Sequence, residues 1–207
     1  MRRIQQIAVV LMLAGTAVAC GAPHHIHYYE LDPGPMAATP SAPQIPVTIL
    51  IARITATHLY RDDRLVYGSG PVELGTYEYE RWSESPVDII QDGLITSLRS
   101  SGQFGMVGRI GSNVRGNYIL RGHLNSMYEV DKPLVARFSL ELELFDTKSG
   151  MTVWTSTYSH DEPVSGKSVA DVIEAMDKNV HAGIEQLTGG IAQYFADHPP
   201  KAAASGN

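Results

Sequence analysis

The second half of the chain alternates apolar and polar residues with a period of two. Between residues 136 and 144 every second residue is apolar, and the residues between them are polar. This alternation predicts a strand with one face in the core and the other in water. Segments 118–128 and 153–158 have related patterns, and turn sequences at 131–133 and 146–150 separate the three. We therefore predict a three-stranded antiparallel meander.

Two other segments carry apolar residues at helical spacing. The first begins with Ser85-Pro86, a capping residue followed by proline at the first helical position, and Asp88 completes a pattern like a capping box. Ser168 and Asp171 begin the second segment in a similar way. Its apolar stripe runs as far as Tyr194 and predicts a long surface helix that packs on a sheet.

The first half of the chain supplies the remaining strands. A nearly continuous apolar run at 47–54 predicts a central strand covered on both faces, and short β-rich segments follow at 65–68 and 72–79. Segment 104–107 is a further short strand candidate, whereas the glycine-rich stretch Gly105–Gly111 favours a loop and fits neither a P-loop nor a dinucleotide fingerprint. The predicted fold class is α+β, a single domain with a mostly antiparallel sheet and two principal helices packed on one face.

The amino terminus has the pattern of a bacterial lipoprotein signal. Two arginines precede a short apolar run, and small residues lead to Cys20, the only cysteine of the chain. We predict cleavage before Cys20 and lipidation of its thiol. Ordinary signal-peptidase cleavage after Ala19 is the alternative, because Ala17 occupies the position, three residues before the cysteine, where leucine is commonest in lipoprotein signals. Gly21 follows the cysteine where an aspartate would favour the inner membrane, so we expect the periplasmic face of the outer membrane.

A proline-rich tether follows this signal. Within it, Tyr28, Tyr29 and Leu31 form an apolar patch, which we expect to add a strand either to the domain itself or to a partner. We divide the chain into a signal peptide, the lipidated cysteine with its tether, the α+β domain and a disordered tail, at residues 1–19, 20–45, 46–197 and 198–207.

Charge excludes one class of partner. Cleavage before Cys20 removes Arg2 and Arg3 and lowers the formal charge from −6 to −8. So acidic a chain lacks the basic face that nucleic acids require, so we expect no nucleic-acid partner and expect membrane contact through the lipid anchor. Since Cys20 is the only cysteine, the domain has no internal disulfide and depends on burial for its stability.

No residue pattern indicates an enzyme, a cofactor or a metal site. His24, His25 and His27 cluster in the tether, but they lack the second pair of ligands that a structural zinc site usually has. The chain has no nucleophile elbow and no recognisable carboxylate pair. We therefore expect a non-catalytic protein without cofactor or metal, and a periplasmic hydrolase is the weaker alternative.

The stretch Tyr77–Leu98 joins an aromatic strand end to the first helix. Tyr79, Arg81 and Trp82 lie just before this helix, and Pro86 begins it. A tryptophan at such a corner either closes the core or offers a surface to a partner, while Arg81 pairs with a carboxylate or stacks on an aromatic ring. These four residues and the aromatic patch of the tether are our candidates for partner binding or structural anchoring.

Taken together, these elements resemble the ABC-type transport auxiliary lipoproteins. The resemblance rests on the signal ending at Cys20, on Tyr28-Tyr29-Glu30-Leu31, on Arg81-Trp82-Ser83-Glu84-Ser85-Pro86, and on the meander with its long final helix. It implies a non-catalytic accessory role in an MCE-type lipid transport system. An MCE-domain protein is the implied partner, with an ABC permease and ATPase as indirect partners, and a homo-oligomeric ring is left open. The alternative is an outer-membrane lipoprotein that activates or scaffolds another envelope machine, such as a cell-wall synthase.

Overall fold

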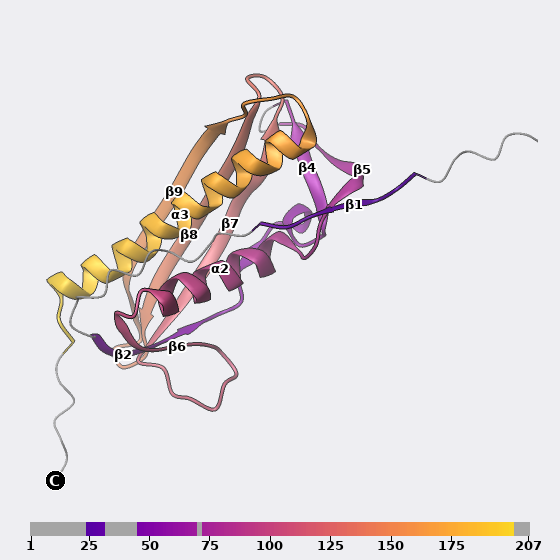
Figure 1. The fold of residues 1–207 in the computed structure, drawn as a ribbon. Helices are drawn as coiled ribbons and strands as arrows, with labels where there is room; N and C mark the ends of the chain where they lie inside the picture. Colours follow the sequence, from indigo (N-terminus) through magenta and orange to yellow (C-terminus); the bar gives the residue numbers. More distant parts are fainter. Residues whose placement is uncertain (1–23, 32–44, 70–71, 201–207) are drawn as a thin grey trace, which may run out of the picture.

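A computed structural model describes residues 24–31, 45–69 and 72–200. In these ranges the chain forms one mixed sheet of nine strands, with helices α2 (Pro86–Ser100) and α3 (Val169–Asp197) on one face (Figure 1). A 3-10 helix, η1 (His58–Tyr60), follows the third strand. The strands are β1 (His27–Tyr29), β2 (Ile45–Ile51), β3 (Thr55–Ala56), β4 (Arg64–Gly68), β5 (Leu74–Trp82), β6 (Phe104–Arg109), β7 (Tyr118–Val130), β8 (Val135–Asp146) and β9 (Met151–Pro163).

Strand β7 lies at the centre of the sheet and pairs along both of its edges. On one side, β8 and β9 follow as the predicted antiparallel meander. Along the other edge, β2 pairs near Leu120, β3 near Leu124 and β4 near Val130, all parallel to β7. Strands β5 and β1 extend the sheet beyond β4, and β6 lies beyond β2. The longest ladders are antiparallel, so the predicted α+β class is confirmed, in the form of a mixed sheet.

The main core lies between the sheet and α3. Helix α3 approaches β8 and β9 closely at Gly183, where a Cβ atom would come within 2.7 Å of Tyr158 and 2.8 Å of Phe138. Asn179, one turn earlier, has no exposed surface. The predicted alternation in β8 is confirmed, because its fully buried apolar residues are Ala136, Phe138, Leu140, Leu142 and Leu144.

The predicted helix starts are found at Ser168 and Ser85, with different capping. Helix α3 has a complete capping box, in which Ser168 accepts from the N–H of Asp171 and its own N–H donates to the Asp171 carboxylate. At α2, the Ser85 hydroxyl instead donates to the Asp88 carboxylate at 2.6 Å, and no backbone N–H is capped by it. The two side chains at the start of α2 therefore bind each other.

The predicted loop at Gly105–Gly111 is wrong over its first residues. Residues Phe104–Arg109 form β6, which pairs in parallel with β2. A Cβ atom at Gly105 would lie 3.3 Å from the Val47 carbonyl oxygen, so a glycine eases the approach of the two backbones. Glycines that indicate a loop in the sequence here allow a close strand pair.

Two strand boundaries also differ from the prediction. Strand β5 continues to Trp82 instead of ending at residue 79, because its last residues pair with β1. The apolar run at 47–54 leaves the strand conformation after Ile51, and the chain pairs with β7 again only at Thr55. Both boundaries are set by partners distant in the sequence, which local propensity does not reveal.

Several predictions fall outside the described residues. They concern the signal peptide, Cys20, most of the tether, the turn at Gly70-Pro71 and most of the tail. Within the described ranges, no helix combines the length and the hydropathy needed to cross a bilayer.

Candidate docking site

The aromatic patch of the tether forms β1 at one edge of the sheet. It pairs in parallel with the end of β5, and the Tyr29 carbonyl accepts a hydrogen bond from the N–H of Ser83 at 2.8 Å. Tyr28 is 61% exposed, whereas Tyr29 is half-buried and Leu31 is part of the core. Of the two expectations for the patch, addition to its own domain is the one observed, and it leaves Tyr28 accessible.

Glu80 of β5 connects β1 to the sheet through side chains. Its carboxylate accepts a hydrogen bond from the Tyr29 hydroxyl at 2.7 Å and lies 3.2 Å from Nδ1 of His27. Burial, followed by the hydrogen bond to Glu80, raises the pKa of Tyr29 to about 12. The hydroxyl is therefore a donor at neutral pH, which fits its contact with a carboxylate.

Trp82 is a core residue at the corner between β5 and α2. It is 3% exposed and lies beside Val172 and Met176 of α3, around a gap of only about 10 Å³. Its backbone N–H donates to the Asp63 carbonyl at 2.6 Å. Pro86, at the start of α2, is buried as well. Both residues hold the corner together and offer almost no surface to a partner.

Tyr79 and Arg81 alternate with Glu80 and Trp82 and so lie on the other face of β5. Arg81 donates to the Asp63 carboxylate at 2.7 Å. The Tyr79 ring stacks on His24 with their centroids 4.6 Å apart, and a hydrogen bond with Glu78 raises the pKa of Tyr79. We call the group at this margin the β1 edge, and it consists of the exposed His24, Ile26 and Tyr28 and the partly exposed Tyr79.

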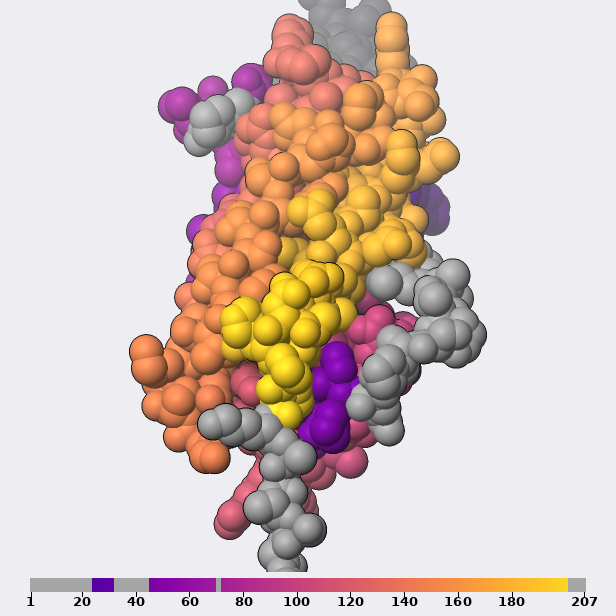
Figure 2. All heavy atoms as spheres, turned by 90° about the vertical axis from the view of Figure 1, so that its left-hand side faces the viewer, coloured from indigo at the N-terminus to yellow at the C-terminus, as the bar shows by residue number. Residues whose placement is uncertain are grey.

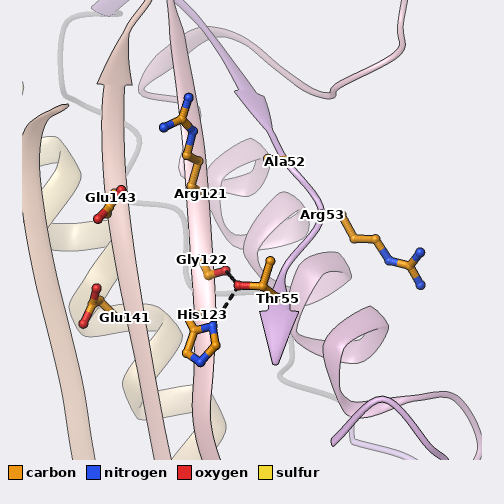
Figure 3. Close-up of a pocket in the computed structure, with 8 residues that line it drawn as sticks. All are labelled: Ala52, Arg53, Thr55, Arg121, Gly122, His123, Glu141 and Glu143. Atoms are coloured by element: carbon orange, nitrogen blue, oxygen red, sulfur yellow. Dashed lines mark hydrogen bonds between the residues drawn. The ribbon is translucent and has the colours of Figure 1, made fainter. Parts of the chain in front are cut away.

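A polar cleft of about 380 Å³ lies elsewhere, along β3, β7 and β8 (Figure 3). Arg121 stands opposite Glu143 in the β7–β8 pair, and His123 stands opposite Glu141. The Arg121 guanidinium lies 4.3 Å from the centroid of the Phe145 ring. The lining residues are Ala52, Arg53, Thr55, Arg121, Gly122, His123, Glu141 and Glu143.

Thr55 and His123 are in contact in this cleft but are not arranged as a nucleophile and its base. The Thr55 hydroxyl donates to the Gly122 carbonyl at 2.9 Å and lies 2.8 Å from Nδ1 of His123 (Figure 3). Because the hydroxyl has a single proton and directs it to Gly122, Nδ1 is the donor in the second bond. In this arrangement Nδ1 carries a proton and is not the acceptor for the Thr55 hydroxyl. The arrangement is suited to binding charged or hydrogen-bonding groups.

The polar cleft is not among the features predicted from the sequence. The alternation in β8 marked Glu141 and Glu143 as solvent-facing, and the same signal exists for Arg121 and His123 in β7. The alternation does not show the register between β7 and β8, which places Arg121 opposite Glu143 and His123 opposite Glu141. Arg53 belongs to segment 47–54, which the sequence predicts to be a strand covered on both faces, so it was not expected to line a cleft.

Two histidines of the tether contact side chains of β5. His27 contacts Glu80, and His24 stacks on Tyr79, so these two have protein partners. Across the described ranges, no group of three or more histidine, cysteine, aspartate or glutamate residues is positioned to hold a metal ion.

Solved structures share this fold at low sequence identity. Protein XCC0632 from Xanthomonas campestris, of family DUF330, has a TM-score of 0.74 and 19% identity, over 83% of this chain and 98% of its own. An uncharacterised protein has a TM-score of 0.61 and 13% identity, over 82% and 98%. The hypothetical protein CT253 from Chlamydia trachomatis has values of 0.52 and 6%, over 73% and 99%. At these identities the likeness establishes the fold alone.

A family match covers most of the domain. No curated protein matches the sequence significantly. The family described as ABC-type transport auxiliary lipoprotein component matches over residues 29–188, from β1 into α3. This range includes the corner and every strand from β2 to β9, and it confirms the resemblance drawn from the sequence. The chain therefore belongs to the family of ABC-type transport auxiliary lipoprotein components.

Proposed function

We propose that this chain is a lipid-anchored, non-catalytic auxiliary component of an MCE-type lipid transport system, and that it docks the MCE-domain partner at the outer membrane. The family match over residues 29–188 is the observation that carries this proposal. The anchor at Cys20, the periplasmic face of the outer membrane and the division at residues 19, 45 and 197 are parts of the same proposal. They rest on the sequence pattern of the amino terminus and the tail.

The β1 edge is the surface that we propose for docking. Ile26 and Tyr28 are 45% and 61% exposed, which is unusual for large apolar side chains that lie next to each other. In the described part of the chain β1 pairs only with β5, so its outer backbone groups are available to an added strand. Trp82 and Arg81 contribute to this surface indirectly, because their contacts with the core and with Asp63 fix the position of β5.

Co-purification with the cognate MCE-domain protein tests this surface. We expect Tyr28→Ala combined with Tyr79→Ala to lower the recovered complex at least tenfold, because Tyr28 is exposed at the β1 edge, Tyr79 is partly exposed there, and neither is part of the core. Met151→Ala is the control, since Met151 is 65% exposed on a different strand. Wild-type recovery of the double variant would rule out the β1 edge as the docking surface.

A homo-oligomeric ring is also part of the proposal. Among the described strands β9 pairs only with β8 and β6 pairs only with β2, so each of them leaves one backbone edge unpaired, apart from the β1 edge proposed for docking. A repeated contact between two different edges is the head-to-tail arrangement that closes into rings. Light scattering on the purified chain measures this directly, and a monomer at every concentration tested would exclude the ring.

A further inference from the structure

An apolar cleft of about 610 Å³ lies at the end of the molecule where α3 terminates. Its walls come from the start of β2, at Ile45 and Pro46, and from the last turns of α3, at Ala192 and Ala196. Figure 2 looks onto this end, where the end of α3 (yellow) lies against the start of β2 (purple). The volume falls within the roughly 300–1,000 Å³ that is usual for small-molecule sites.

Aromatic packing and a backbone hydrogen bond hold this cleft open. Phe195 lines it and is 2% exposed, with its ring edge-on to Tyr118 at 4.9 Å and to Phe104 at 6.0 Å between centroids. The Ile45 N–H donates to the Gln103 carbonyl at 2.5 Å. This bond connects the start of β2 to the short segment between α2 and β6. The cleft is therefore formed before any ligand enters it.

The side chains that line the cleft favour a hydrocarbon chain over a peptide as its ligand. Among the described residues that line the cleft none is charged, and the polar side chains are those of Gln103 and Gln193. The Gln193 amide already donates to Asp197 at 3.0 Å. A peptide in this cleft would bring backbone N–H and C=O groups that find few partners, which is unfavourable. A hydrocarbon chain brings none, and each of its CH₂ groups gains by leaving water.

We propose that this cleft binds one acyl chain of a lipid, whose headgroup stays in water. The inference rests on the proposed function and deepens it, since it assigns direct lipid contact to this chain. In Figure 1, β1 lies on the side of the molecule away from the C-terminal end of α3. The acyl-chain site therefore lies away from β1.

Gly189 provides a direct test, because a side chain there would occupy the cleft. A Cβ atom at Gly189 meets nothing within 4 Å, and the residue lines the cleft. Gly189→Leu fills this space and also raises helix propensity, so the fold is retained. Ala182→Leu is the matched control, since Ala182 is exposed two turns earlier on α3 and does not line the cleft. Ala196→Glu is a second variant, which puts a carboxylate into the apolar lining at an exposed position.

The probe is cis-parinaric acid, whose fluorescence rises when its chain leaves water, titrated without detergent into the whole chain carrying Cys20→Ser. We expect one probe bound per chain, at least tenfold weaker binding with Gly189→Leu and Ala196→Glu, and unchanged binding with Ala182→Leu. Palmitic acid and palmityl alcohol should compete equally, because no cation in the described lining selects a carboxylate.

Three outcomes would overturn the acyl-chain site. They are no uptake by the parent chain, uptake that both cleft variants leave unchanged, or uptake that begins only after Met36→Asp. The last would identify segment 32–44, which joins the domain at Ile45, as the occupant instead. Co-purification with the MCE-domain protein is measured on the same variants. A parent chain that forms the complex but binds no probe counts against the cleft alone, and a parent chain that binds the probe but forms no complex counts against the docking function alone.

Discussion

Asn179 is the polar residue on which the contact between α3 and the meander depends. Its amide nitrogen donates to the carbonyls of Ala136 and His160, and its oxygen accepts from the Tyr158 hydroxyl, at distances of 2.8 to 3.0 Å. Asn179→Ala leaves buried polar groups without partners, so we expect the free energy of unfolding to fall by about 3 kcal/mol. Tyr158→Phe removes one of the three bonds and should cost about 1 kcal/mol. Urea unfolding measures both, and equal effects of the two variants would contradict this assignment.

The pair of Arg137 and Asp161 makes the stability depend on pH. The guanidinium donates two hydrogen bonds, at 2.7 and 2.6 Å, and these hold the pKa of the Asp161 carboxyl below its ordinary value. Because the pKa is lower in the folded state, the contribution is present above the unfolded pKa, near 3.8, and is lost as the pH falls through the folded pKa. Both side chains are partly exposed, so we expect Asp161→Asn to cost only about 0.5 kcal/mol at pH 7.

Urea unfolding of Asp161→Asn and of the parent chain from pH 7 to pH 3 checks this sign. The difference between the two should shrink as the pH falls below about 3.8. Thr155→Ala, on the same strand, has no charge and should show no such trend. A difference that grows toward acid would contradict the assignment.

Among the elements, β1 is the one that local opening should release first. It has three residues, pairs with β5 alone in the described ranges, and is held to the core by Leu31. We expect Leu31→Asp to detach β1, because a carboxylate is costly in the core, while the meander and α3 stay folded. Hydrogen exchange should then rise in residues 24–31 and at the end of β5, and stay slow in β8. Glu30→Ala, at an exposed neighbour, is the control, and faster exchange throughout the chain would refute a separate opening of β1.

At the scale of the whole molecule, the proposed lipid anchor at Cys20 predicts which end faces the membrane. Three residues lie between Cys20 and His24, and this length of chain reaches at most about 14 Å. A lipid on Cys20 therefore keeps the β1 edge close to the membrane and leaves the apolar cleft toward the periplasm. We expect Cys20→Ser to move the protein from the membrane pellet to the soluble periplasmic fraction, since acyl chains supply the membrane affinity.

Membrane fractionation on a density gradient measures the location of the parent chain and of this variant. Gly21→Asp, which keeps the cysteine, should stay in the pellet and shift toward the inner membrane. A Cys20→Ser chain that remains in the pellet would contradict lipidation as the anchor, and would favour ordinary cleavage with another means of attachment.

The sequence by itself determined the features that depend on near neighbours along the chain. Both helices and their first residues follow from apolar spacing and from Ser85 and Ser168, because a helix is built from contacts three and four residues apart. The meander follows from alternation at 136–144 and from short turns. The family follows from the order of these elements together with short motifs, and the match over residues 29–188 confirms it.

Only the tertiary structure decided the features made by residues far apart in the sequence. These include the parallel pairing of β1 with β5, the succession of β2, β3 and β4 along β7, and the parallel pairing of β6 with β2, which extends the strand candidate at 104–107 to Arg109. Trp82 could have faced a partner, and its burial against α3 depends on a helix that begins 87 residues later, at Val169. The polar and apolar clefts likewise combine side chains from distant strands and helices. The period of a segment shows which of its faces is buried, but the neighbour that covers this face is chosen only when the whole chain folds.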